Sequence, residues 1–311
     1  MPEKSNFYNL QERKNRLFNK SEETVYQQLI KSESISQSNV FSKIRIADVI
    51  NITNSGISKN WYSYALKAHF DFVICDDSFM PKFVIEFNGP SHLDEKKKMQ
   101  DDIKAGLCKR FDLPLLQIND RYLNPNYGEK LSLLAWILDI YYIQKEFDIA
   151  QEKGDISWEE DLHPLFIYIS DLNGNSSCRY AIGDNSRLKL QNLYEQNKLL
   201  DSTPSGIIGY DKNGVFRGCS FISVDNNFCI YTDSAMRNYN FPAKLNFLFE
   251  EILIINLEKK IDNYLLNNKG LMPLENALER ALKLRKKIHL ISCGSCGEIT
   301  NYFNEYNFFS W

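Results

Sequence analysis

The hydrophobic and polar positions at the start of the chain predict a helix, a strand and a loop, in that order. In residues 21–30 apolar side chains recur at helical spacing, and Ser21 is placed to cap the N-terminus of the helix. Residues 43–50 alternate in part between apolar and polar side chains, and we predict a strand there although Asp48 interrupts the alternation. Residues 51–60 are rich in Asn, Ser and Gly, which is typical of a loop.

The pattern then predicts a β-hairpin, a helix and a further strand. Two apolar runs, residues 70–75 and 83–87, flank the polar turn sequence 76–81, which is the signature of a hairpin. Residues 94–111 have the periodicity of an amphipathic helix, and residues 113–118 form a short apolar strand. The apolar stripe of this helix consists of Met99, Ile103 and Leu107. Together these elements predict a βαβ crossover.

The pattern of predicted helices and strands changes near the middle of the sequence. A long amphipathic helix is predicted at residues 129–147, and the polar, acidic residues 151–163 that follow mark a domain boundary. We therefore predict a first domain at residues 1–150 and an α+β domain of unknown function at residues 151–311. In the second domain, short β runs are predicted at residues 165–169, 206–210, 218–224 and 228–231, and helices at residues 243–266 and 274–288.

Two carboxylates interrupt the apolar strands of the predicted hairpin. If Asp71 pairs with Glu86, the centre of the hairpin falls between Ser78 and Phe79, which is where the turn is predicted independently. The two acids would then lie opposite each other on one face, with β-carbons about 5 Å apart. Such like charges repel unless one is protonated, an Arg or Lys pairs with them, or a cation lies between them. If the pair has a function, a hard divalent ion such as Mg²⁺ is the cation that would lie between the two carboxylates and remove their repulsion.

Further polar residues surround this pair in the sequence. Asn88 lies on the same strand face as Glu86, and His92 follows just beyond the strand end, where it either caps the loop or contacts phosphate. Asp101 and Lys104 are spaced to share one face of the helix. They form either a solvent-exposed salt bridge or, if the crossover brings them to the carboxylates, part of a catalytic site.

These residues together resemble a known superfamily. Asp71, the segment Glu-Phe-Asn-Gly-Pro-Ser-His at 86–92, the segment Asp-Asp-Ile-Lys at 101–104 and the segment Leu-Pro-Leu-Leu-Gln-Ile at 113–118 resemble the PD-(D/E)XK nuclease superfamily. Within it, the chain is similar to a bacterial family of uncharacterised restriction-endonuclease-like domains, which is similar in turn to very-short-patch-repair-type endonuclease domains. The resemblance covers about residues 20–120. It implies an α/β restriction-endonuclease-like core with the order αβββαβ and a mixed sheet.

The resemblance also implies an activity and roles for particular residues. Asp71 and Glu86 would be metal ligands, Lys104 the catalytic lysine displaced onto the helix, and Glu22 or its neighbour Glu23 the acid of the first helix. Asn88, His92 and Asp101 are further candidate catalytic residues. The cofactor would be Mg²⁺ or Mn²⁺, and the activity endonucleolytic hydrolysis of DNA in defence against foreign DNA, antiphage defence included, or in DNA repair.

Two positions depart from the pattern of the superfamily. Asn88 stands in the slot that usually holds a lysine and that this family more often fills with Asp, and Gln117 stands where the family commonly has Arg. These departures keep two alternatives open. The chain is either a catalytically degenerate nuclease fold that binds nucleic acid or protein, or a nuclease subunit that is active only within a complex.

The charge of the chain is nearly balanced but unevenly distributed. There are 37 Lys and Arg against 40 Asp and Glu, so the net charge of −3 excludes a histone-like polycation and leaves a local basic groove possible. Basic residues are concentrated in an N-terminal arm and in two helices, and those of the arm are Lys4, Arg13, Lys14, Arg16 and Lys20. The candidate nucleic-acid-binding side chains are Lys96, Lys97, Lys98, Arg280, Lys283 and Lys287. The alternative for both groups is an ordinary solvent-exposed helix face.

The cysteines and the termini bear on compartment and metal content. Seven cysteines without disulfide-like spacing, and an N-terminus without an apolar signal segment, predict a cytoplasmic protein with free thiols and no membrane association. Cys293 and Cys296 have the spacing of half a zinc site, but no second Cys-x-x-Cys completes it. DNA is the predicted partner, and a protein partner or a homo-oligomer stays open.

Overall fold

The computed structural model describes residues 17–36, 38–89, 95–123, 131–170, 176–237, 241–295, 299–306 and 308. Contacts divide the chain into two compact units, and each is described by itself. The first comprises Met1–Leu107 with Gln117–Leu123, and the second comprises Cys108–Leu116 with Asn124–Trp311. This grouping places the helix α6, Leu133–Lys153, with the second unit. The domain division at residue 150 stays a prediction.

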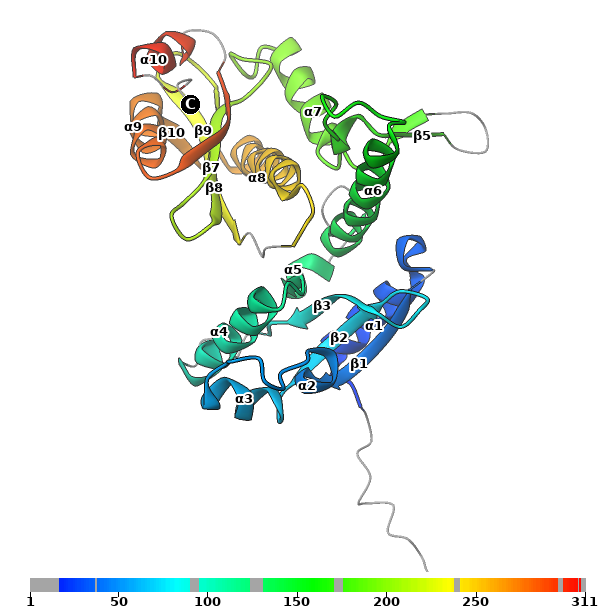
Figure 1. Cartoon of the computed structure of the whole chain (residues 1–311). Helices are drawn as coiled ribbons and strands as arrows, with labels where there is room; N and C mark the ends of the chain where they lie inside the picture. The colour runs from blue at the N-terminus through cyan, green and yellow to red at the C-terminus, as the bar shows by residue number, and fades with distance from the viewer. Residues whose placement is uncertain are drawn as a thin grey trace, which may run out of the picture. The chain divides into compact units, whose positions relative to one another are not determined.

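The first unit contains the strands β1, β2 and β3 (Figure 1) of a four-stranded sheet with the order β1-β2-β3-β4, and the first two residues of β4 are grouped with the second unit. The strands of this sheet are β1 (Asn39–Arg45), β2 (His69–Cys75), β3 (Pro81–Phe87) and β4 (Leu115–Ile118). The first three strands are antiparallel, and α4 (Glu95–Arg110) makes the crossover from β3 to its neighbour β4, so the sheet is mixed. With α1 (Lys20–Lys31) in front, the order of the main elements is the predicted helix, three strands, helix and strand.

The N-terminus of α1 is capped differently from the prediction. Asn19, not Ser21, is the N-cap, because its side chain accepts from the backbone N–H of Glu22 while the Glu22 carboxylate accepts from the backbone N–H of Asn19. This reciprocal capping box starts the helix at Lys20. The hydroxyl of Ser21 instead donates to Asp120 Oδ1 at 3.2 Å, in α5 (Asp120–Leu123).

The prediction of a strand at residues 43–50 was wrong at both ends. The strand β1 begins at Asn39 and ends at Arg45, and Ile46–Val49 forms the short helix α2. The change comes where Asp48 breaks the alternation, because its carboxylate receives two hydrogen bonds from Arg45 within this turn. The predicted loop at residues 51–60 is largely confirmed, but it leads into an unpredicted helix, α3 (Lys59–Ala65).

The hairpin and the helix that follows were predicted closely. The strands β2 and β3 contain the two apolar runs, and the turn between them is closed by hydrogen bonds from Asp76 N to Met80 O and from Phe79 N to Asp76 O, both 3.0 Å long. In α4, Ile103 and Leu107 are buried as expected, whereas Met99 is 57% exposed. The apolar stripe therefore covers only the C-terminal part of the helix.

The second unit is built around a five-stranded antiparallel sheet with the order β10-β9-β8-β7-β11. Its strands are β7 (Ser205–Tyr210), β8 (Val215–Ser223), β9 (Phe228–Arg237), β10 (Leu271–Pro273) and β11 (His289–Gly294). Besides α6, its helices are α7 (Asp184–Glu195), α8 (Leu245–Asn267), α9 (Leu274–Arg285) and α10 (Ile299–Glu305). A separate two-stranded sheet joins β5 (Tyr168–Ser170) to β6 (Ser176–Cys178).

Helices cover both faces of the larger sheet (Figure 1). On one face Ile222 and Ile230 pack with α7 and α8, and on the other Phe221 and Tyr231 pack with α9 and α10. This alternation along β8 and β9 follows from the two-residue period of strands. The strands β7, β8 and β9 and the helices α8 and α9 confirm the predicted α+β character of this unit. The strand predicted at residues 165–169 was wrong in its first part, because Pro164–Phe166 forms a 3-10 helix and β5 begins at Tyr168, and α7 and β11 were not predicted. Within the described residues, no helix is long and apolar enough to cross a membrane.

Candidate functional site

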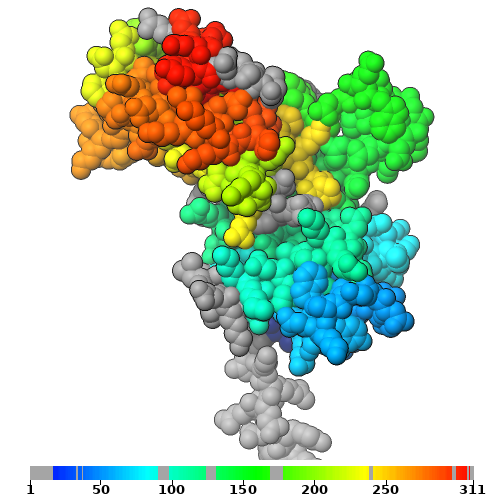
Figure 2. Space-filling model, turned by 60° about the vertical axis from the view of Figure 1, so that its left-hand side comes forward, coloured from blue at the N-terminus to red at the C-terminus, as the bar shows by residue number. Residues whose placement is uncertain are grey.

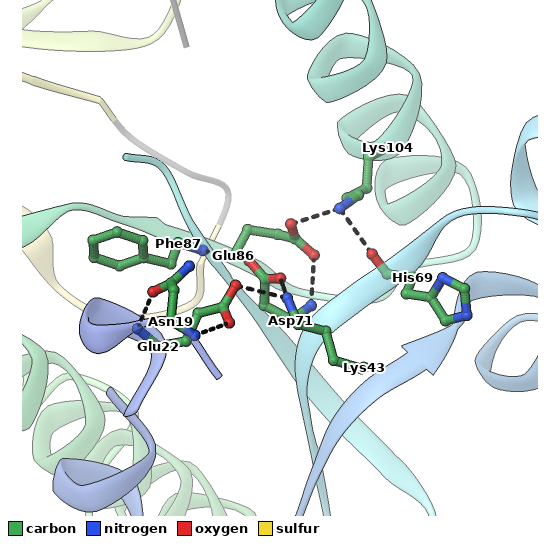
Figure 3. A network of polar contacts seen from close by, with 8 residues as sticks. All are labelled: Asn19, Glu22, Lys43, His69, Asp71, Glu86, Phe87 and Lys104. Carbon is green, nitrogen blue, oxygen red and sulfur yellow. Dashed lines mark hydrogen bonds and ion pairs between the residues drawn. The ribbon is translucent and has the colours of Figure 1, made fainter. Parts of the chain in front are cut away.

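The two carboxylates of the hairpin lie side by side at the open end of β2 and β3 (Figure 3). Phe72 lies opposite Ile85, and continuing this register by one residue places Asp71 opposite Glu86, as the sequence predicted. Glu86 Oε1 accepts from the backbone N–H of Asp71 at 3.1 Å, and Asp71 Oδ2 accepts from the backbone N–H of Phe87 at 3.0 Å. The strand backbones thus hold each carboxylate by one oxygen.

Lys104 reaches this pair from the helix α4. Its Nζ donates to Glu86 Oε2 at 2.5 Å and to the backbone oxygen of His69 at 3.0 Å (Figure 3). Lys104 is only 8% exposed and Glu86 only 6%. The interpretation of Lys104 as one end of a solvent-exposed helix salt bridge is therefore wrong, because the crossover carries this side chain into the hairpin.

A second lysine, which was not predicted from the sequence, contacts the other carboxylate. Lys43 in β1 donates to Asp71 Oδ1 at 2.5 Å and to Glu22 Oε1 at 2.8 Å. Its backbone is left-handed, with a φ of 56°, between the strand pairs that Ser42 and Ile44 make with β2. A lysine rarely adopts this conformation, and such strain is concentrated at functional sites.

Glu22 joins the cluster through Lys43. One of its carboxylate oxygens caps α1 through the backbone N–H of Asn19, and the other accepts from Lys43 (Figure 3). Glu22, the predicted acid of the first helix, is thus linked to Asp71 through the ammonium group of Lys43, which contacts both carboxylates. Glu22 rather than Glu23 makes this contact.

Burial changes the titration of the central groups. It raises the pKa of Glu86 to about 7, and the charge of Asp71 acts in the same direction while Lys104 opposes it. Burial alone would lower the pKa of Lys104, but the adjacent Glu86 outweighs it and the pKa is raised. The same charges also act on Tyr64 in α3. Burial raises the pKa of its hydroxyl, and Lys104 and Glu86 are among the charges that act on it.

The remaining predicted residues of this unit have different outcomes. The backbone N–H of Asn88 donates to Ile118 O at 2.7 Å, which ties the end of β3 to β4. Asp101 is half-buried on α4, one turn before Lys104. Lys98 is exposed. His92, the side chains of Lys96 and Lys97, and residues 1–16 of the predicted basic N-terminal arm lie outside the described residues.

The cluster has the donors that a hard cation requires, but they are already engaged. Three carboxylates (Glu22, Asp71 and Glu86) face two ammonium groups (Lys43 and Lys104), which leaves one negative charge in excess when Glu86 is ionised. Among the described residues, no group of three or more His, Cys, Asp or Glu side chains is arranged to hold a metal ion. Mg²⁺ in proteins is commonly bound by one or two carboxylates with water and phosphate, so Asp71 and Glu86 are the residues that would hold such an ion here.

The predicted basic residues of the second unit line a groove of about 970 Å³. Arg280, Lys283 and Lys287 contribute to it from α9 and its C-terminal end, and two further cations that were not predicted, Lys212 and Arg217, contribute from the β7–β8 hairpin. Figure 2 shows α9 in orange beside this hairpin in yellow-green. The groove also contains two acids, of which Asp211 is paired with Arg217 at 2.7 Å.

The half zinc site at the end of β11 is described in part. Cys293 is a free, half-buried thiol, and burial raises its pKa to about 11. Cys296 lies outside the described residues. A thiol with a raised pKa is a weaker metal ligand than an ordinary one, because metals bind the thiolate.

Comparison with known proteins identifies a matching family but no characterised relative. Residues 14–131 match the model of a family described as a protein of unknown function (DUF2726). This match includes every described residue of the Asp71–Glu86–Lys104 cluster. No curated protein and no solved structure matches the chain significantly.

Proposed function

We propose that the chain is a divalent-metal-dependent nuclease that hydrolyses phosphodiester bonds of DNA at the site formed by Asp71, Glu86 and Lys104. The observation that carries this proposal is the contact of Lys104 Nζ with Glu86 Oε2, made next to Asp71 and almost fully out of solvent. Acids on two paired strands with a lysine from the crossover helix are also the arrangement that the resemblance to PD-(D/E)XK nucleases implies.

The energetics of the cluster support a functional interpretation. Transferring an ammonium and a carboxylate out of water costs several kcal/mol per ion, and a buried ion pair often stabilises less than apolar side chains of the same volume. Glu86 also has a raised pKa, and Lys43, whose backbone conformation is left-handed, lies in β1 next to the strand that carries Asp71. Converging groups with perturbed titration are concentrated at functional sites.

The residues of the cluster have different roles in phosphodiester hydrolysis. Asp71 and Glu86 would hold the metal, which when bound activates a water molecule and neutralises charge on the phosphate. Lys104 is held in one orientation by Glu86 and the backbone oxygen of His69. Its raised pKa keeps it protonated, so it orients the attacking water or donates to a phosphate oxygen instead of acting as a base.

A second candidate is a binding module without catalysis. It is favoured by the bonds that already engage the carboxylates, because both oxygens of Asp71 and both oxygens of Glu86 accept hydrogen bonds from lysine or backbone N–H groups. The two candidates differ in their response to metal. A module of this kind would bind DNA or a protein equally well with Mg²⁺ or with a chelator, and it would be indifferent to substitution of Glu86.

Asp71→Asn is the variant that tests the proposed activity. We expect it to lower the rate of Mg²⁺-dependent cleavage of plasmid or single-stranded DNA at least about 100-fold, because an amide cannot supply the anionic metal ligand. Asp76→Asn is the matched control, since Asp76 lies in the turn of the same hairpin and pairs with Lys82 at 2.8 Å. Cleavage that persists in excess chelator, or that is equal in the two variants, would contradict the proposal.

A second prediction concerns the basic groove, which we propose binds the phosphate backbone of the same substrate. Replacing Lys212, Lys283 and Lys287 together by glutamine should weaken DNA binding by the full chain. The slope of log affinity against log salt should fall by about 1 for each phosphate that the variant no longer neutralises. Fluorescence anisotropy with a labelled duplex measures both quantities. The control is a triple variant of equal charge in which Lys259, Lys269 and Lys286 are replaced by glutamine. Equal effects of the two triple variants would exclude the groove as the DNA-binding surface.

A further inference from the structure

The second unit has a cavity that neither the nuclease proposal nor the basic groove uses. It has a volume of about 690 Å³, within the usual range of small-molecule sites. It lies on the opposite face of the sheet from α9, where α7 and α8 meet β7, β8 and β11. Its apolar lining includes Leu190, Ile208 and Leu253.

The cavity lining has more negatively than positively charged side chains. Among the described residues they are Arg187, Glu195 and Glu250. The guanidinium of Arg187 is already bound by the fully buried Glu251 and lies 3.4 Å from Asp184. Glu251 also accepts from the backbone N–H of Gly183 at 2.7 Å, so this ion pair is fixed in the wall.

The two carboxylates that face the cavity are bonded to neutral groups. Glu195 accepts from the side-chain amide of Gln191 at 3.2 Å, and Glu250 accepts from the hydroxyl of Ser292. Burial raises the pKa of Glu250, and the neighbouring Glu251 adds to this while Arg187 opposes it. A cationic ligand would supply the counter-charge that stabilises the ionised form of Glu250.

Tyr194 gives the site a second means of recognising a cation. This side chain lines the same cavity from α7 and is 45% exposed. Aromatic faces attract organic cations, and apolar side chains beside them accept the body of such a ligand. An inorganic ion does not fit this lining, because apolar walls cannot replace its hydration shell.

We infer that this cavity binds a small organic cation, namely an amine with an apolar or aromatic body, with its ammonium group placed at Glu250. The inference does not depend on the activity of the first unit. Anionic ligands such as nucleotides are excluded by the same charges, since the one cation in the described part of the lining is already paired.

Calorimetric titration of the full chain with three indole probes of different charge tests the inference. Tryptamine is the cation, indole the neutral analogue and indole-3-propionate the anion. We expect saturable binding of tryptamine with a dissociation constant on the order of 0.1–1 mM, as ligands of this size allow, and at least about tenfold weaker binding of the anion. No saturable binding of tryptamine, or equal binding of the anion, would overturn the inference.

Two variants locate the binding in this cavity. Glu250→Gln should weaken tryptamine binding about tenfold and leave indole binding unchanged, because only a charge-assisted hydrogen bond is removed. Gln191→Arg places a cation on the exposed part of α7 without changing the core, and it should weaken tryptamine and strengthen indole-3-propionate. Unchanged tryptamine affinity in both variants would place the binding elsewhere and overturn the assignment.

Discussion

Replacing Lys104 by methionine is expected to destabilise the first unit by about 3–5 kcal/mol and to abolish Mg²⁺-dependent cleavage. The loss of stability arises because Glu86, 6% exposed, would be left as a buried carboxylate without its cation. In the proposed mechanism activity is lost because the ammonium that would orient the water or contact the phosphate is removed. Urea denaturation and plasmid cleavage measure the two effects on the same preparation.

The double variant Lys104→Met with Glu86→Gln separates folding from catalysis. Without either charge the pair no longer needs compensation, so stability should return to within about 1 kcal/mol of the original chain. Cleavage should remain absent. Lys82→Met is the control for removal of an exposed ion pair on the same hairpin, and it should cost no more than about 1 kcal/mol. Retained cleavage by the double variant would show that the cluster has only a structural role.

The second large effect is a dependence of stability on pH. The pKa of Glu86 is raised by burial to about 7 in the folded chain, from an ordinary value of 4.5. The folded state therefore binds this proton more tightly than the unfolded state does. The resulting stabilisation is complete below about pH 4.5 and is lost as the pH rises through about 7, and it amounts to roughly 3 kcal/mol.

The comparison with Glu86→Gln isolates this contribution from those of other groups. With a chelator present, the free energy of unfolding should be measured between about pH 4.5 and 8 for both proteins. The original chain should lose stability relative to Glu86→Gln as the pH rises across this range, because the glutamine has no proton to release. A difference that is constant with pH, or that changes in the opposite sense, would contradict the raised pKa.

The hairpin and its crossover were predictable because their signals are local. The two apolar strands, the turn between them and the period of α4 fix where Asp71, Glu86 and Lys104 lie. The opposition of the two acids follows from the chain itself, whereas the register shift between Ile74 and Cys75, which centres the turn on Ser78, did not follow from it. The sequence did not predict which cations neutralise the two acids, since this depends on which side chains the other elements bring next to them.

Lys43 shows why the rest of the site was not predictable. Its contact with Asp71 depends on the register of β1, and the alternation of apolar and polar residues did not give the boundaries of that strand. The contact also depends on a left-handed backbone at Lys43, and no glycine in the neighbouring sequence indicates such a conformation. Met99 has the spacing of a core residue but lies beyond the covered part of α4. The cavity at Glu250 joins five elements distant in sequence, and α7 and β11 among them had not been predicted.

The central claim is that Asp71 and Glu86 hold a divalent metal, and calorimetric titration of the full chain with Mn²⁺ tests it most directly because no knowledge of the cleaved DNA is needed. We expect saturable binding of one Mn²⁺ per chain, weakened at least about tenfold by Asp71→Asn and by Glu86→Gln. Asp76→Asn should bind as the original chain does. Absence of binding, or equal affinity in all four proteins, would contradict this claim.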